Sequence, residues 1–265
     1  MKFYDFEYDG KTLTNLGYIV CQFDANGGIE TVSNGSNITF NTVSSDYHKN
    51  EYLINSEYSE PLTATFQICK NYCINDDKEI YPEEVREITR WLNRRIFLPI
   101  KLINDMGEDL YTEASFNVSC IYIADTIYGL ELEMTTNKPF LLRAEREIKI
   151  NCNSKNQTFD IYDNSEEIGY INTKAIINIK ESGNLQIFNS LENRQTYIKN
   201  CTAGEVITMD YPIITSSLNS HKIQNDFNWN FIRLSNTYYD NKNTLKISLP
   251  CDIILRYSPI AKIGL

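Results

Sequence analysis

Residues 3–24 read FYDFEYDGKTLTNLGYIVCQFD, and residues 82–98 read PEEVREITRWLNRRIFL. In the first stretch, an Asp-Gly pair and a Leu-Gly-Tyr sequence separate short apolar runs, which is typical of consecutive β-strands joined by tight turns. The second stretch has the amphipathic period of an α-helix. Together they predict a strand-rich chain that contains a single substantial helix.

The helix is predicted over Pro82–Leu98. Pro82 suits the first helical position, because an N–H group there has no partner inside the helix, and Glu83 and Glu84 suit the positive end of the helix dipole. Its apolar stripe consists of Val85, Ile88, Trp91, Leu92 and Ile96. We expect this stripe to pack on strands and to close one open face of a β-barrel.

The rest of the chain is predicted to form strands. Leu62–Cys69 alternates as a half-buried strand does, whereas residues 42–59 show no clear period. Eight short strands at intervals of about ten residues are predicted after residue 150, which is typical of a β-sandwich. They are Gln157–Tyr162, Ala175–Glu181, Leu185–Asn189, Gln195–Asn200, Val206–Met209, Asn228–Leu234, Thr244–Leu249 and Asp252–Tyr257.

The charge is divided unevenly between two parts of the chain. Residues 1–150 hold 24 acidic and 14 basic residues, whereas residues 151–265 hold 11 of each. This asymmetry favours two domains, 1–150 and 151–265. It also argues against tight DNA binding, which needs clustered Lys and Arg to contact phosphates.

The sequence offers no motif for catalysis, a cofactor or a metal. We find no Gly-X-Ser-X-Gly, no phosphate-binding loop and no dinucleotide fingerprint. Cys69 and Cys73 lack the two further ligands that a zinc site needs.

No run of 18 apolar residues predicts a membrane span. The start MKFYDFEYDG does not resemble a secretory signal, so we expect a cytoplasmic product with seven reduced cysteines.

One group of residues could bind a glycan. Asp226, Asn228, Trp229 and Arg233 lie on or beside one predicted strand, and an aromatic ring with nearby amides and carboxylates can hold a sugar. The spacing of Phe227, Trp229 and Phe231 favours the other interpretation, in which all three rings face the core.

Four motifs, in this order, give the chain a resemblance to a known family. They are LGYIVCQFD at 16–24, RWLN followed by LPIKLIND at 90–105, NKPF at 137–140 and TLKISLPCDIILRYSPIAKIGL at 244–265. The pattern resembles the distal tail protein of siphophages that infect Gram-positive hosts, which is the baseplate hub, or its counterpart in a phage-tail-like particle.

The resemblance implies a fold and a role. Residues 1–150 would form a tail-tube-like β-sandwich or barrel with one flanking α-helix, and residues 151–265 a galectin-like β-sandwich. The chain would close into a homohexameric ring at the virion tail tip, after assembly in the host cytoplasm. The ring would join the tail tube protein to the tail-associated lysin or fibre protein.

DNA would pass through the lumen without being bound specifically, and an acidic lumen would repel its phosphates. The alternative that the sequence leaves open is a carbohydrate-binding module or adhesin that recognises host cell-wall glycans.

Overall fold

The computed structural model describes residues 3–23, 35–44, 50–74, 77–104, 107–237 and 239–262. Three parts of the motifs, Asp24, Asp105 and residues 263–265, therefore lie outside the described residues. The chain is mainly β, as predicted, and forms two compact units. The first is Met1–Ala144 with Ala261–Leu265, and the second is Glu145–Ile260, so the division falls a few residues before the predicted boundary at 150.

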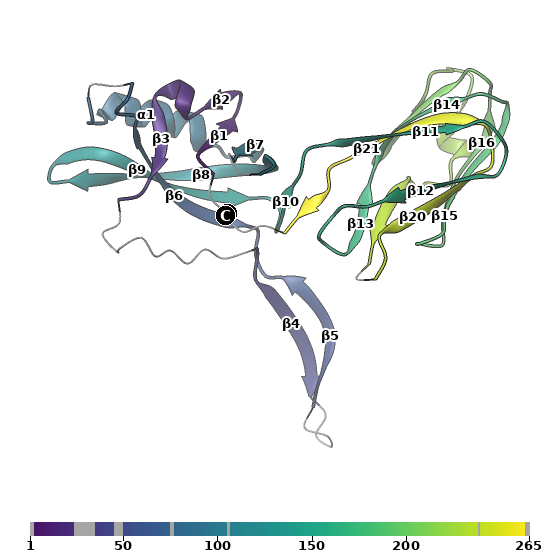
Figure 1. Ribbon diagram of the computed structural model, residues 1–265, viewed down its shortest axis with the longest axis horizontal. Coiled ribbons are helices and arrows are strands. Elements are labelled where there is room, and N and C mark those ends of the chain that lie inside the picture. Colours follow the sequence, from purple (N-terminus) through teal and green to yellow (C-terminus); the bar gives the residue numbers. More distant parts are fainter. Residues whose placement is uncertain are drawn as a thin grey trace. The chain divides into compact units, whose positions relative to one another are not determined.

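The first unit is built on one large antiparallel sheet (Figure 1). Its principal strands follow the order β2-β1-β7-β8-β9-β6-β3. Their bounds are β1 (Asp5–Tyr8), β2 (Lys11–Thr12), β3 (Tyr18–Cys21), β6 (Thr63–Lys70), β7 (Leu98–Ile103), β8 (Leu110–Ile123) and β9 (Thr126–Thr136). The short strands β10 (Leu141–Leu142) and β22 (Ile260–Ala261) pair with each other at the side of this sheet.

The helix α1 (Pro82–Leu92) covers one face of that sheet and closes the core of the first unit. Ile88, Trp91 and Leu92 are buried there, and Val85 packs against them. The Trp91 ring stacks on Phe6 at 5.7 Å between centroids. Its indole N–H donates to the backbone oxygen of Tyr8 at 2.8 Å, so the helix is fixed to β1 by a directional bond as well as by apolar contact.

The helix is shorter than predicted, because it ends at Leu92 and not at Leu98. The Asn93 side chain donates to the backbone oxygen of Phe116 at 2.9 Å, and Arg94 Nε donates to the backbone oxygen of Trp91 at 3.1 Å. These bonds turn the chain away from the helix axis before β7 begins. Ile96 therefore lies outside the helix with 63% of its surface exposed, and its place in the predicted stripe was wrong.

The second unit is a sandwich of two antiparallel sheets, in the orders β11-β21-β14-β17-β18 and β12-β20-β15-β16. Side chains that alternate along these strands fill one core. The strands are β11 (Arg146–Cys152), β12 (Gln157–Tyr162), β14 (Lys174–Ile179), β15 (Gly183–Asn189), β16 (Arg194–Cys201), β17 (Val206–Asp210), β18 (Ile213–Ser216), β20 (Lys242–Ile247) and β21 (Cys251–Tyr257).

Three smaller elements differ from the prediction for this unit. A ribbon of β13 (Gly169–Asn172) and β19 (Arg233–Asn236) joins the sandwich, and one helical turn, α2 (Ile223–Asp226), precedes β19. The predicted strand Asn228–Leu234 begins only at Arg233.

All seven cysteines are unpaired. Within the described ranges, no helix has the length and apolar character needed to cross a membrane.

Candidate functional site

The first candidate surface is a hairpin of β4 (Ile38–Ser44) and β5 (Glu51–Tyr58), which pair only with each other (Figure 1). Nearly every residue in it is exposed. The register breaks between Asn41 and Thr42, so Ile54 is left without a partner on β4. This bulge explains why residues 42–59 show no strand period in the sequence, since an extra residue interrupts the alternation.

The two faces of the hairpin differ in polarity near its base, where Ile38 and Phe40 lie on one face and Thr39 and Asn41 on the other. Leu53 joins Ile38 and Phe40 because it pairs with Thr42. These three side chains are 45%, 61% and 59% exposed. On the other face, Asn41 Nδ2 donates to Asn55 Oδ1 at 2.8 Å. A two-stranded hairpin is marginal by itself, and its exposed apolar side chains make it a candidate interaction surface.

The second candidate surface is the face of the large sheet that points away from the core and α1. Leu132 and Met134 of β9 are buried, so Glu131 and Glu133 between and beside them point to the opposite face. By the same alternation, Glu113 of β8 lies on that face because Ala114 is buried.

These three carboxylates are held by amides and not by cations. Gln67 Nε2 donates to Glu131 Oε2 at 3.3 Å, and Asn117 Nδ2 donates to Glu133 Oε2 at 3.2 Å. Asn137 donates to Glu113 in the same way. None of the three forms an ion pair with another described residue, so the face keeps its negative charge.

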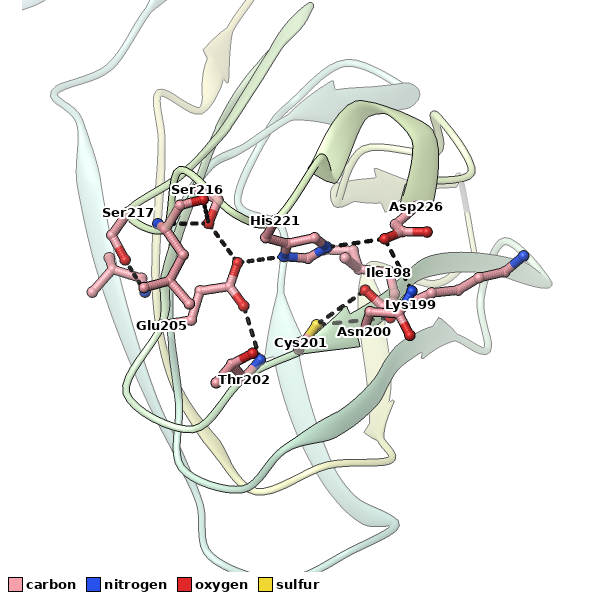
Figure 2. Close-up of polar contacts among 12 residues, drawn as sticks. Ile198, Lys199, Asn200, Cys201, Thr202, Glu205, Ser216, Ser217, His221 and Asp226 are labelled. Atoms are coloured by element: carbon pink, nitrogen blue, oxygen red, sulfur yellow. Dashed lines mark hydrogen bonds and ion pairs between the residues drawn. The ribbon is translucent and has the colours of Figure 1, made fainter.

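The third candidate is a buried polar cluster in the second unit, which Figure 2 shows around His221. His221 Nδ1 lies 2.5 Å from Glu205 Oε1, and its Nε2 lies 3.4 Å from Asp226 Oδ2. Glu205 is fully buried and also accepts bonds from the Thr202 amide at 2.9 Å and the Ser216 hydroxyl at 2.5 Å. The cluster thereby ties the turn after β16 to the loop after β18 and to α2.

Burial raises the pKa of the Glu205 carboxyl, but the Ser216 hydroxyl, the Thr202 amide and the His221 ring outweigh burial and leave this pKa below its ordinary value. The carboxylate form is therefore the stable one. A pocket of about 350 Å³ adjoins the cluster and is lined in part by Ser216 and His221.

The geometry of this cluster does not match nucleophilic catalysis. A Ser-His-Asp triad needs one ring nitrogen of the histidine directed at the nucleophile. Here both ring nitrogens of His221 face carboxylates, and the Ser216 hydroxyl donates to Glu205. Across the described residues, no group of three or more His, Cys, Asp or Glu side chains could hold a metal ion.

The structure does not bring the predicted glycan contacts together as one open site. Asp226 Oδ2 lies 3.4 Å from His221 Nε2 and accepts a bond from Asn200 Nδ2 at 3.1 Å. Asn228 bonds the backbone of β16, with its Oδ1 3.0 Å from the Tyr197 amide. The guanidinium of Arg233 is held by Glu192 and Tyr170: Nε lies 2.8 Å from the Glu192 carboxylate, and the group sits 3.8 Å from the Tyr170 ring centroid.

Trp229 is the exception among these four residues, since its side chain is 55% exposed. Phe227 and Phe231 are buried, at 5% and 3% exposure, so these two rings face the core as the spacing predicted. Trp229 turns outward because its backbone is left-handed, with φ at +59°. The strand alternation that would have turned it inward does not extend to this loop.

Comparisons with known proteins agree with this architecture. The model of a phage tail protein N-terminal domain matches residues 1–138, and the model of a phage tail C-terminal domain matches residues 140–257. Among solved structures, the Dit (gp 19.1) protein of phage SPP1, described as a paradigm of hub adsorption apparatus in Gram-positive infecting phages, is similar to this chain. The TM-score is 0.66 at 12% sequence identity, and the match covers 97% of this chain and 99% of that one. No curated protein sequence matches significantly.

Proposed function

Because the chain belongs to the family of phage tail proteins whose N-terminal and C-terminal domain models cover it, and has the fold of Dit, we propose that it is a distal tail hub. In this proposal the first unit closes into a homohexameric ring at the virion tail tip. The ring joins the tail tube protein to the tail-associated lysin or fibre protein, and DNA passes through it. Assembly takes place in the cytoplasm of the host bacterium.

The β4–β5 hairpin is the observation that supports ring formation most strongly. Its apolar face, formed by Ile38, Phe40 and Leu53, is exposed in the single chain. Burying apolar surface contributes about 25 cal/mol per Å², so a neighbouring copy that covers these side chains would stabilise both the hairpin and the ring. Cyclic symmetry would repeat the same contact at every junction.

Paired substitutions on the two faces of the hairpin test this contact. Phe40→Glu places a charge in the apolar face, whereas Thr39→Glu places the same charge on the opposite face one residue away. We expect light scattering to show smaller particles for Phe40→Glu and an unchanged assembly for Thr39→Glu. Equal effects of the two variants would refute a role for the apolar face.

The open acidic face of the first unit supports the proposed passage of DNA. A ring that DNA slides through should not bind phosphates, and carboxylates without cationic partners repel them. We propose that Glu113, Glu131 and Glu133 line this lumen. The sequence suggested an acidic lumen, and the alternation along β8 and β9, which puts these three acids on one face, supports that proposal.

Charge reversal in assembled particles tests the lumen. Glu131→Lys together with Glu133→Lys should slow DNA ejection, because the lysines would hold phosphates in the channel. Glu87→Lys serves as the control, since Glu87 is an exposed residue of α1, on the covered side of the sheet. Ejection at the rate of the unaltered particle would remove this part of the proposal.

We propose no catalytic role, and turnover of purified peptidoglycan by the chain would contradict that view. Carbohydrate binding, the alternative function, has one observation in its favour, which is the exposed ring of Trp229. Carbohydrate binding would then be an additional property of the second unit, because the fold and the family both favour the hub as the main function.

A further inference from the structure

We propose that Trp229 and Tyr211 form a binding platform for a neutral oligosaccharide on the second unit. The inference does not depend on ring formation, because all the residues involved belong to the sandwich. It also replaces the glycan contacts predicted from the sequence, of which only Trp229 remains available.

The conformation of Trp229 is the first argument. A bulky residue in the left-handed region is an outlier, because the side chain crowds the backbone there, and Gly or Asn would fit better. The ring is nevertheless 55% exposed, and its indole N–H has no hydrogen bond to any described residue. A strained residue that presents a large ring to solvent indicates a role in recognition.

The second argument is that the ring is held in place before any ligand binds. Trp229 packs on Phe227 at 5.8 Å and on Phe231 at 6.5 Å between centroids, and both of these rings are buried. On its N-terminal side, Asn228 Nδ2 donates to the backbone oxygen of Gln195 at 2.9 Å. On the other side, Asn230 Nδ2 donates to the same oxygen at 3.1 Å. A ring fixed in this way loses little entropy on binding.

A second exposed ring extends the surface. Tyr211 is 61% exposed and meets Phe231 edge-on at 5.3 Å. The Trp229 ring centroid lies 6.5 Å from that of the same Phe231. The centroids of the two exposed rings, Trp229 and Tyr211, therefore cannot lie farther apart than these two distances added together. An oligosaccharide of a few units can reach across such a span, with one sugar on each ring.

The chemistry of the loop favours a neutral sugar over other ligands. Residues 227–232 read FNWNFI and carry no charge, so the loop itself offers nothing to hold a phosphate or another ion. Sugars have an apolar face of C–H groups and hydroxyls that both donate and accept. An indole ring suits the first, and the carboxamide oxygen of Asn230, which accepts no bond from another described residue, suits the second. A peptide rich in proline is the competing ligand that such rings could hold.

Titration of the full-length chain with neutral tetrasaccharides tests the proposal. Chitotetraose, cellotetraose and maltotetraose would be added separately, with tryptophan fluorescence and calorimetry as readouts. The chain has two tryptophans, and Trp91 is only 4% exposed, so a ligand-induced change in emission would report Trp229. We expect saturable binding of at least one of the three sugars.

Three variants locate the site. Trp229→Asn suits the left-handed backbone and should keep the fold while weakening binding by about tenfold or more. Tyr211→Ala should weaken it less. Tyr239→Ala is the matched control, because Tyr239 is 98% exposed and contributes to neither ring pair, and it should leave binding unchanged. Thermal unfolding of each variant confirms that the second unit is folded.

The proposal is overturned if none of the three sugars binds, or if Trp229→Asn binds as well as the unaltered chain. Binding of decaproline without binding of any sugar would also overturn it, in favour of a peptide surface. The ring variant Phe40→Glu should bind sugar normally, so failure of this proposal and failure of the hub proposal can be told apart.

Discussion

Removal of the His221 ring should destabilise the second unit strongly. In the structure, this ring lies 2.5 Å from the fully buried carboxylate of Glu205. His221→Ala would leave that carboxylate without its ring partner, and the loss of a hydrogen bond to a charged group costs about 1.5–3 kcal/mol. Glu205 keeps the donors from Thr202 and Ser216, so we expect a loss of about 2 kcal/mol.

The assay is chemical denaturation of the full-length chain followed by hydrogen exchange and mass spectrometry, which reads the two units from separate peptides. Lys222→Ala is the control, because Lys222 is the exposed neighbour of His221 and should change stability by less than about 0.5 kcal/mol. Peptides from the first unit should show unaltered protection in both variants.

A double variant distinguishes a stranded carboxylate from simple loss of packing. Glu205→Gln combined with His221→Ala removes the buried charge that the single His221 variant leaves without its partner. The double variant should therefore lose less stability than the two single variants lose together, by about 1 kcal/mol or more. Additive effects, or a loss below about 1 kcal/mol in His221→Ala alone, would refute the reasoning.

Three further outcomes follow from the structure. The free energy of unfolding of the second unit should fall as the pH drops below 4.5, the ordinary pKa of glutamate, because a lowered Glu205 pKa stabilises the fold only while the carboxyl is ionised. Urea titrations at pH 3 to 6 measure this fall, and Glu205→Gln should make it less steep. Trp91→Ala should cost the first unit about 3–5 kcal/mol by urea unfolding, whereas Ile96→Ala should cost less than about 0.5 kcal/mol. Iodoacetamide should modify the exposed Cys73 well before Cys251, whose full burial raises its thiol pKa to about 12, as peptide mass spectrometry will show.

Local sequence signals predicted the start of the helix but not its end. Pro82 at the first helical position is a signal within one turn of chain, and the helix begins there. The end depends on Asn93, whose amide bonds the Phe116 backbone oxygen on a strand later in the chain. Such a partner cannot be inferred from helical period, which continued through Ile96.

The candidate surfaces were predicted incompletely for similar reasons. The bulge at Ile54 hid strand β5, although the apolar run Tyr52–Ile54 was a usable signal for it. The pairing of Glu205 with His221 joins residues from two loops, and no local pattern connects them. Trp229 was expected to face the core, because period-two spacing assumes an extended backbone that this loop does not have.

The mass of the purified chain in solution tests the central claim most directly. Light scattering at several concentrations, with negative-stain images of the same samples, compares the particle with the 30.7-kDa single chain. The hub account predicts closed rings of about six copies with a central hole, alone or on addition of purified tail tubes. A monomer under every one of these conditions would contradict it.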